Sequence, residues 1–424
     1  MSEWKELKIE DFCEVIGGGT PSTKEDSYYG GEISWITPRD LTNYKKRFIL
    51  RGERNITELG LKNSSARILP KNSILLTSRA PIGYLAIAEK EVCTNQGFKS
   101  LVINPEKADY NFVYYLIKSN VERIKGLGTG TTFAEISGSV VKNLKFSLPD
   151  LPTQTAIAEI LSSLDDKIEL NNKINQELET LAQTLFKQWF IDFEFPNENG
   201  EPYKSSCGEM MVSELGEIPK GWEVNKLSKV TIISSSKRIF SEEYVNEGIP
   251  FFRGKEITEL DKSNKISSEL FISEERYNEI KSKFGSPKIG DILITSVGTI
   301  GNTYLVNDDF NFYFKDGNIT WIKDYISYLS PYYIFTWLRS KNTQNYIKEV
   351  CIGSTQQALT ISALNNLNIV LPDELTESKF TLIANDIYTS ISKNKNENQE
   401  LTNLRDTLLT KLISGELEIN EINN

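Results

Sequence analysis

The chain has 424 residues and a net charge of −10; it is 39% hydrophobic and 25% charged, and it contains no histidine. This length suits two or three domains, and the composition is that of a water-soluble globular protein. The missing histidine excludes Ser-His and Cys-His catalysis and every histidine-ligated metal centre.

Other function classes are excluded by motifs that the sequence lacks. It has no G-x-x-x-x-G-K-[ST] loop, which argues against a P-loop nucleotidase. Its four cysteines, Cys13, Cys93, Cys207 and Cys351, form no C-x-x-C pair, so we expect free thiols and no metal site. No apolar run reaches the roughly 18 residues of a membrane helix, and the N-terminus does not resemble a signal peptide. We therefore expect a cytoplasmic protein that does not contact a membrane.

The first predicted element is a globular block over residues 1–151. Short β-branched runs bounded by Gly and Pro alternate with one or two helical stretches, which indicates an α+β fold. Two turns rich in glycine, Gly17–Pro21 and Gly128–Thr132, could hold a phosphate through free backbone N–H groups. A turn that simply follows a strand is the commoner explanation.

A long helix is predicted next, over residues 152–195. After Pro152 no Gly or Pro occurs as far as Phe190, and apolar residues recur in alternating steps of three and four. This is a heptad seam, interrupted by polar residues at Lys167 and Asn171. The seam residues are Ile157, Ile160, Leu164, Asn171, Leu178, Leu181 and Leu185.

The second half of the chain repeats the first. A polar linker at 196–220 leads to a second α+β block at 221–372 and a second long helix at 373–424. ILLTSRAPIG at Ile74–Gly83 matches ILITSVGTIG at Ile292–Gly301, which indicates an internal duplication. The second helix continues the seam with Asn394, Leu401, Leu404 and Leu408.

The two long helices could pair with each other or lie separately in a larger bundle. We favour mutual pairing, because the polar interruptions recur together with the leucines: Asn171 falls on Asn394, 223 residues later. The predicted fold is therefore α+β, with two similar domains separated by two long helices that pair as an antiparallel coiled coil. A pseudo-twofold axis would relate the two repeats.

The distribution of charge leaves nucleic-acid binding open. Acidic residues concentrate in the predicted helices and linker, whereas the two globular blocks are neutral to slightly basic. The overall negative charge therefore does not exclude DNA as a partner.

Taken in this order, the features resemble the specificity subunit of a Type I restriction-modification system. The similarity covers essentially the whole chain and includes Leu148-Pro149 before the first long helix, SELGEIPKGW at Ser213–Trp222, and LLTKLISGEL at Leu408–Leu417. It implies that 1–151 and 221–372 are target-recognition domains, each reading one half of a bipartite double-stranded DNA site. It also implies that the helices set the spacing and dock two methyltransferase subunits, with restriction subunits joining the full complex. Catalysis would then lie in the partners, and this chain would have no catalytic residue, cofactor or metal.

Candidate DNA contacts are Arg and Lys, which suit guanine or phosphate, and Asn and Gln, which suit adenine. In the first block they are Arg39, Lys45, Lys46, Arg47, Arg79, Asn95, Gln96, Lys99 and Thr131. In the second block they are Lys237, Arg238, Arg253, Lys255 and Lys315. We expect about a third of these to contact DNA, mostly at phosphates. Positions that differ between the repeats, such as Arg79 against Val297, are the better candidates for base reading.

Two rival interpretations remain. The chain could be a scaffold that binds only proteins through its coiled coil and blocks. It could also be a nuclease, because Pro372-Asp373 followed by Glu377-Ser378-Lys379 imitates a PD…ExK site. We interpret that stretch as the start of a helix, because the first repeat has no counterpart after Pro149-Asp150.

Overall fold

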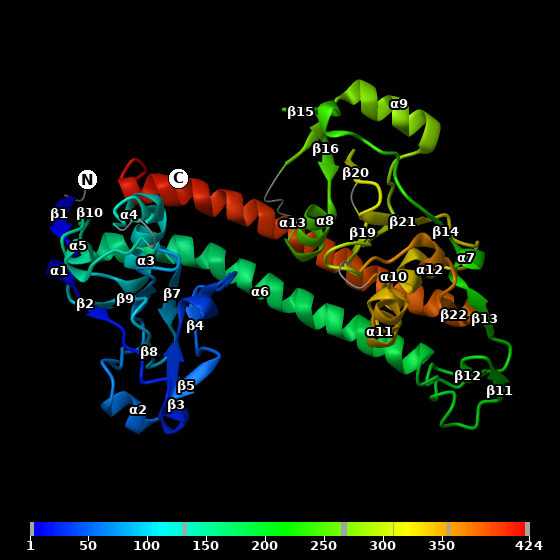
Figure 1. Cartoon of the computed structure of the whole chain (residues 1–424), viewed down its shortest axis with the longest axis horizontal. Helices are drawn as coiled ribbons and strands as arrows, with labels where there is room; N and C mark the ends of the chain where they lie inside the picture. The colour runs from blue at the N-terminus through cyan, green and yellow to red at the C-terminus, as the bar shows by residue number, and fades with distance from the viewer. Residues whose placement is uncertain (1–3, 130–133, 264–268, 308, 354–356, 420–424) are drawn as a thin grey trace. The chain divides into compact units, whose positions relative to one another are not determined.

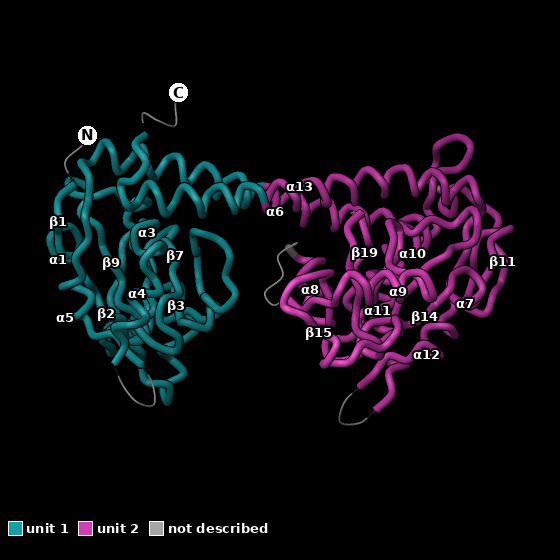
Figure 2. The backbone as a smooth tube through the Cα atoms, turned by 90° about the horizontal axis from the view of Figure 1, so that it is seen from above, with its two compact units in different colours: residues 1–170, 400–424 teal, residues 171–399 magenta. Residues whose placement is uncertain are grey.

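The computed structural model describes residues 4–129, 134–263, 269–307, 309–353 and 357–419. The chain divides into two compact units, coloured separately in Figure 2. Unit 1 comprises residues 1–170 and 400–424, and unit 2 comprises residues 171–399. In the described part of the chain, no helix is both long and apolar enough to cross a membrane.

Among its described residues, unit 1 contains three small sheets, most of whose strands are labelled in Figure 1. The largest has the strand order β2-β9-β6-β7-β4, and the others are β5-β3-β8 and β1-β10. The strands are β1 (Lys5–Lys8), β2 (Cys13–Gly17), β3 (Tyr29–Ile36), β4 (Phe48–Ile49), β5 (Arg54–Ile56), β6 (Ile74–Leu76), β7 (Leu85–Ala88), β8 (Cys93–Thr94), β9 (Lys99–Ile103) and β10 (Lys145–Leu148). The short helices are α1 (Ile9–Phe12), α2 (Glu58–Lys62), α3 (Tyr110–Ser119), α4 (Val121–Lys125) and α5 (Gly138–Lys142).

Unit 2 contains sheets in the orders β14-β21-β18-β19, β15-β17-β16-β20, β13-β22 and β11-β12. Its strands are β11 (Met210–Ser213), β12 (Gly216–Pro219), β13 (Glu223–Lys226), β14 (Ile232–Ser234), β15 (Tyr244–Val245), β16 (Ile249–Phe252), β17 (Phe271–Ile272), β18 (Ile292–Thr295), β19 (Thr303–Leu305), β20 (Tyr313–Phe314), β21 (Ile319–Lys323) and β22 (Asn368–Leu371). Its short helices are α7 (Leu227–Val230), α8 (Gly254–Ser263), α9 (Glu274–Phe284), α10 (Pro331–Arg339), α11 (Lys341–Val350) and α12 (Ile361–Asn365).

The two units share one topology. The order β2-β9-β6-β7 in unit 1 corresponds to β14-β21-β18-β19 in unit 2, and the pair β1-β10 corresponds to β13-β22. A short parallel pair also occurs at the equivalent place in each unit, β3 with β8 and β16 with β20, and unit 1 has a further parallel pair, β4 with β7. The duplication predicted from the sequence is therefore confirmed in the fold.

The two long helices are α6 (Leu151–Phe190) and α13 (Glu374–Ser414), which run side by side in Figure 1. Asp150 starts α6 by accepting a hydrogen bond from the amide of Thr153 at 3.1 Å. Asp373 starts α13 in the same way, accepting from the amide and the hydroxyl of Thr376. Gly415, with φ of 74°, provides the left-handed residue that ends α13.

Within unit 2 the helices pair in antiparallel register through asparagines. The Asn171 amide donates to the side-chain oxygen of Asn398 at 3.0 Å, and the Asn394 amide donates to that of Asn175 at 2.8 Å. Asn171 is only 1% exposed and also donates to Glu397 at 2.7 Å. The predicted antiparallel coiled coil is therefore confirmed, with Asn171 and Asn394 each meeting an asparagine of the other helix.

The predicted seam residues differ in how far they are buried. Ile157 and Asn171 are buried, at 2% and 1% exposure. Partly buried positions are Ile160, Leu164, Leu178, Leu185, Asn394, Leu401 and Leu408. Leu181 and Leu404 are 51% and 48% exposed, so the structure does not place them in a buried seam. The heptad pattern marks an apolar stripe, but part of that stripe lies on the surface of the helix pair.

Unit 1 is fixed to both long helices by a buried ionic cluster around Asp165 of α6. Its carboxylate accepts hydrogen bonds from Arg405 of α13 at 2.5 Å and from the Tyr115 hydroxyl at 2.7 Å, with Lys118 at 3.7 Å. Burial alone would raise the pKa of Asp165, but Lys118, Arg405 and Tyr115 outweigh it and hold that pKa below its ordinary value. Burial lowers the pKa of Lys118 more than Asp165 raises it. Arg405 is the nearer of the two cations, at 2.5 Å against 3.7 Å for Lys118.

In unit 2 aromatic packing does the equivalent work. Phe190 of α6 lies with its ring centroid 4.8 Å from Tyr333 of α10 and 5.0 Å from Phe380 of α13. Each such pair contributes about 0.5–1.5 kcal/mol beyond the burial of its area. These contacts fix the second set of sheets to the end of α6 and the start of α13.

We predict that Asp165→Asn destabilises unit 1 by about 3 kcal/mol, because Arg405 and Lys118 lose their buried counter-ion. The folded-state pKa of Asp165 is depressed, so its stabilisation is complete above the ordinary value of 3.8 and is lost as pH falls through the lower folded value. Urea unfolding of the wild type should therefore show this loss below about pH 4, and the variant should lack it. Peptide-resolved hydrogen exchange assigns the effect to unit 1. Equal stability of the two proteins at pH 7 would contradict the role given to this cluster.

Candidate nucleic-acid interface

Several of the candidate DNA contacts of unit 1 lie where four segments of the chain meet. The Ser78 amide donates to the Gly97 carbonyl at 2.7 Å, the Asn95 amide to Ile36 at 3.0 Å, and the Gly19 amide to Thr94 at 2.9 Å. These backbone bonds join the loops 18–21, 77–83 and 95–97 to the ends of β3 and β8, and a short 3-10 helix, Pro38–Leu41, follows β3. We call the segments 18–21, 37–40, 77–83 and 95–97 the loop edge of unit 1. A Cβ at Gly18 would lie 1.9 Å from the Asn95 carbonyl oxygen, so only glycine permits this approach.

Several candidates predicted from the sequence lie on or beside this loop edge. Arg79 and Lys99 share the carboxylate of Glu135, at 3.4 and 3.6 Å. The Asn95 side chain accepts from the Gly97 amide at 2.9 Å, and Gln96 accepts from the Thr20 hydroxyl. Arg39, in the 3-10 helix Pro38–Leu41, has a side chain 84% exposed and lies 3.9 Å from Glu53.

Unit 2 has an equivalent loop edge. The Ser296 amide donates to the Asn318 carbonyl at 2.8 Å, and the Lys315 amide donates to Phe252 at 2.8 Å. The Gly317 amide also donates to the Ser235 hydroxyl at 3.4 Å. These bonds join the segments 235–238, 252–255, 295–301 and 315–318, which we call the loop edge of unit 2. The sequence candidates Lys237, Arg238, Arg253 and Lys315 lie on these segments, and Lys255 lies in the first turn of α8.

The cations of this second loop edge are held by nearby groups. Arg238 contacts Asp316 at 2.9 Å, and Lys255 contacts Glu259 at 3.8 Å. Arg253 pairs at 2.6 Å with Glu256, whose side chain is 1% exposed. The ammonium of Lys237 lies 5.3 Å from the ring centroid of Phe284.

One contact shows how the two loop edges differ. In unit 1 the loop after β2 meets the loop before β9 through two neutral side chains, Thr20 and Gln96. In unit 2 the loop after β14 meets the loop before β21 through an ion pair, Arg238 and Asp316. The backbone arrangement is kept, while the chemistry of the contact changes from a neutral pair to an ion pair.

The basic cluster at Lys45, Lys46 and Arg47 is placed elsewhere. Arg47 is 4% exposed; its side chain contacts Asp166 of α6 and the Tyr115 hydroxyl, and its amide donates to Glu169 at 2.8 Å. The structure therefore gives Arg47 an internal contact with the long helix in place of the predicted DNA contact. Lys45 and Lys46 are exposed beside it, and Thr131 lies outside the described residues.

Sequence reasoning missed Glu135 and Asp316, the carboxylates that orient Arg79 and Arg238. Both are distant in sequence from the cations that they hold. The two repeats differ at this position, since Glu135 pairs with Arg79 in unit 1 and Ala358 pairs with Val297 in unit 2. A charged residue in one repeat opposite an alanine in the other is the signal that could point to Glu135.

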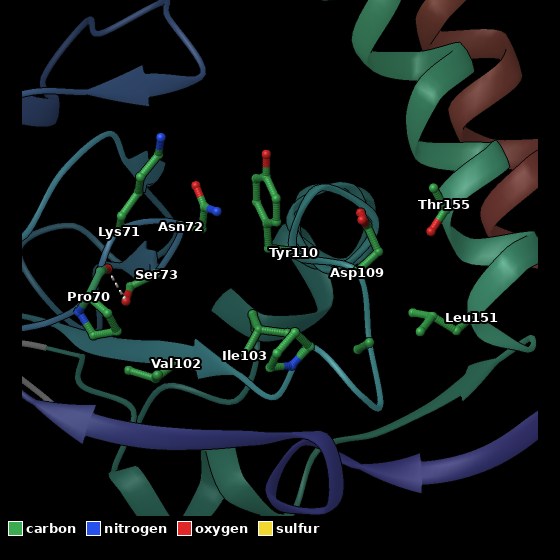
Figure 3. Close-up of a pocket in the computed structure, with 12 residues that line it drawn as sticks. Pro70, Lys71, Asn72, Ser73, Val102, Ile103, Asp109, Tyr110, Leu151 and Thr155 are labelled. Atoms are coloured by element: carbon green, nitrogen blue, oxygen red, sulfur yellow. Dashed lines mark hydrogen bonds between the residues drawn. The ribbon is translucent and has the colours of Figure 1, made fainter.

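Unit 1 also contains a cavity of about 490 Å³, shown in Figure 3. The side chains of Lys71, Asn72 and Tyr110 point away from an apolar floor formed by Val102 and Ile103. None of the residues that line it is among the DNA candidates, so the cavity is separate from the loop edge.

Features that suggest chemistry in the sequence have structural roles. Asp373 caps α13 and accepts from the Trp222 indole at 3.0 Å, while the buried Glu377 accepts from the Ser330 amide at 2.8 Å. Burial raises the pKa of Cys13 to about 12 and of Cys93 to about 11, so neither is a thiolate near neutral pH. The described residues contain no group of three or more Cys, Asp or Glu arranged to hold a metal ion.

The fold and its two loop edges thus define a tandem α+β protein built on one antiparallel helix pair, with a polar, partly basic edge in each unit. Known proteins share this organisation. The family model for the Type I restriction modification DNA specificity domain matches residues 1–180 and 219–404. The chain therefore belongs to the family of Type I restriction-modification specificity subunits, with two target-recognition domains.

Individual relatives match over nearly their whole length. The Type I restriction enzyme MjaIX specificity subunit of Methanocaldococcus jannaschii is 38% identical, over 99% of this chain and 95% of that protein. The HindI specificity subunit of Haemophilus influenzae is 24% identical over 98% of this chain and 100% of that protein. The crystal structure of a Type-I restriction-modification S subunit from M. genitalium has a TM-score of 0.60 at 19% identity, over 97% of this chain and 96% of that one, and shows the same fold.

We predict that Arg47→Ala destabilises unit 1 by about 3 kcal/mol, because it removes a buried guanidinium and leaves Tyr115 without that partner. Lys45→Ala and Lys46→Ala, on the same loop but exposed, should each change stability by less than about 0.5 kcal/mol. Urea denaturation of the three variants provides the comparison. Equal, small effects in all three would show that Arg47 is not an anchor.

Proposed function

We propose that each unit reads one half of a bipartite double-stranded DNA site, through residues 1–151 and 221–372. The observation that carries this proposal is the repeated loop edge, in which one backbone frame presents different side chains. A split, asymmetric target requires two similar but non-identical readers at a fixed separation. The helix pair α6 and α13 would set that separation.

The helix pair is also proposed to dock two methyltransferase subunits. Leu181 and Leu404, 223 residues apart, are both about half exposed, although each lies in an apolar stripe. In unit 2, Leu178, Leu382, Ile383 and Ile387 line a groove of about 300 Å³ one turn from Leu181. Exposed apolar surface of this kind marks protein interfaces, and its repetition suits two copies of one partner.

Chemistry is assigned to the partners. Adenine methylation would lie in the methyltransferase subunits, and translocation and cleavage in restriction subunits of the full complex, all in the cytoplasm. The net charge of −10 offers little counter-ion release on binding DNA, so tight recognition should need those partners.

The proposed function is tested by co-expressing the chain with the methyltransferase encoded beside it and mapping methylated adenines by modified-base sequencing. The expected result is a split motif with a fixed gap that disappears when this chain is omitted. Methylation that is unchanged when the chain is omitted would contradict the proposed specificity role and favour the interpretation of the chain as a scaffold. Magnesium-dependent cleavage by the purified chain, lost on changing Asp373 or Glu377, would instead favour the nuclease reading.

The docking surface yields a separate prediction. Leu181→Asp and Leu404→Asp should each remove one methyltransferase subunit from the complex, and the double variant both, because a buried carboxylate would replace an apolar contact. We expect at least a tenfold loss of affinity at each site, measured by native mass spectrometry during titration. Leu59→Asp, at a residue 50% exposed in α2, which lies away from the helix pair in Figure 1, is the matched control. Full occupancy in the double variant would rule out these leucines as the contact.

A further inference from the structure

Ser78 in unit 1 and Ser296 in unit 2 make the same pair of backbone hydrogen bonds, so the residue that follows each serine occupies the same place in both loop edges. In unit 1 the Ser78 amide donates to Gly97 at 2.7 Å, and the Ile136 amide donates to the Ser78 carbonyl at 3.0 Å. In unit 2 Ser296 makes the same two bonds, with Asn318 at 2.8 Å and Leu359 at 2.9 Å. Arg79 and Val297 follow these serines and are thus structurally equivalent.

Two further positions belong to this frame. Arg79 forms a bridge with Glu135, and Val297 forms the matching bridge with Ala358. Lys99 lies two residues beyond the Gly97 carbonyl, and Thr320 lies two residues beyond Asn318. The set Arg79, Lys99 and Glu135 in unit 1 is therefore replaced by Val297, Thr320 and Ala358 in unit 2.

In unit 1 the carboxylate of Glu135 holds the side chain of Arg79 in one orientation. Glu135 lies between Arg79 and Lys99, at 3.4 and 3.6 Å, with its side chain 39% exposed and that of Arg79 35% exposed. The carboxylate contacts one terminal nitrogen of Arg79, which leaves the rest of the planar fork of N–H donors for a ligand. An arginine held in one orientation loses less side-chain entropy when it binds.

The set in unit 2 carries no charge. Thr320 is 3% exposed and its hydroxyl contacts that of Ser296 at 2.7 Å, so it faces the interior. Val297 is partly exposed and offers only methyl groups to a ligand. The equivalent position therefore presents an apolar surface instead of a donor fork.

We propose that Arg79, oriented by Glu135 and supported by Lys99, reads a guanine in the half-site of unit 1. The inference rests on the proposed function and assigns it one base contact. A guanidinium fork matches the O6 and N7 acceptors of guanine in the major groove, whereas a valine at the same position suits the methyl group of thymine. The nearby carboxylate of Glu135 repels phosphate, so a base edge is the better ligand for Arg79 than the DNA backbone.

The test maps the methylated motif of the complete complex carrying Arg79→Val, Arg79→Lys or Glu135→Gln. Arg79→Val should relax one guanine position in one half-site, with about a 10- to 100-fold loss of discrimination, while the other half-site and the gap stay unchanged. Arg79→Lys should relax the same position, because an ammonium cannot form the paired contact. Glu135→Gln, which keeps Arg79 but releases it, should give an intermediate loss. Lys71→Val, which removes an exposed cation at the rim of the separate cavity, is the control and should leave the motif unchanged.

Two results would overturn this inference. A motif unchanged by Arg79→Val means that Arg79 reads no base. An unchanged motif with uniformly weaker binding in Arg79→Val, restored by Arg79→Lys, identifies a phosphate contact. Both results leave methylation dependent on the chain, whereas failure of the proposed function itself would appear as methylation that does not need the chain at all.

Discussion

The asparagine contacts between α6 and α13 are the constraint on which the rest of the structure depends. Asn171 contacts Asn398, and Asn394 contacts Asn175. Because Asn394 is the repeat equivalent of Asn171, and Asn398 that of Asn175, the same contact occurs twice. A slipped register would set these amides against leucines, and each unpaired buried polar group costs about 1–3 kcal/mol. The helix pair thus gives up some apolar burial for a single register, as buried asparagines do in other coiled coils.

Each unit is then attached to the helices by its own kind of contact. Unit 1 uses the ion pair of Asp165 with Arg405, and unit 2 uses the aromatic packing of Phe190 with Phe380. The loop edges lie on frameworks with the same strand order, so side chains on the loops can change without disturbing the backbone bonds that join them. This arrangement separates stability from recognition and explains how one duplicated fold presents two different surfaces.

Much of this fold could be predicted from sequence, because repeats and heptads are local patterns. The long helices, their pairing and the duplicated α+β blocks follow from spacing alone. The sequence predicts an exposed Arg47 because the stretch around it is basic, whereas its partner Asp166, which accounts for its burial, is distant in sequence. Leu181 and Leu404 fit the heptad yet lie on the surface, since periodicity marks an apolar stripe without saying what covers it. The role of Glu135 could not be predicted from the sequence, because only folding brings it next to Arg79 and Lys99.

The central claim is that one unit reads one half-site, and replacing residues 221–372 with a second copy of residues 1–151 tests it most directly. The chain would then carry two identical readers on an unchanged helix pair. Modified-base sequencing of the resulting complex should show a palindromic split motif, with the half-site of unit 1 on both sides and the original gap. The original asymmetric motif, or loss of any motif from a complex that still binds both methyltransferases, would contradict the account.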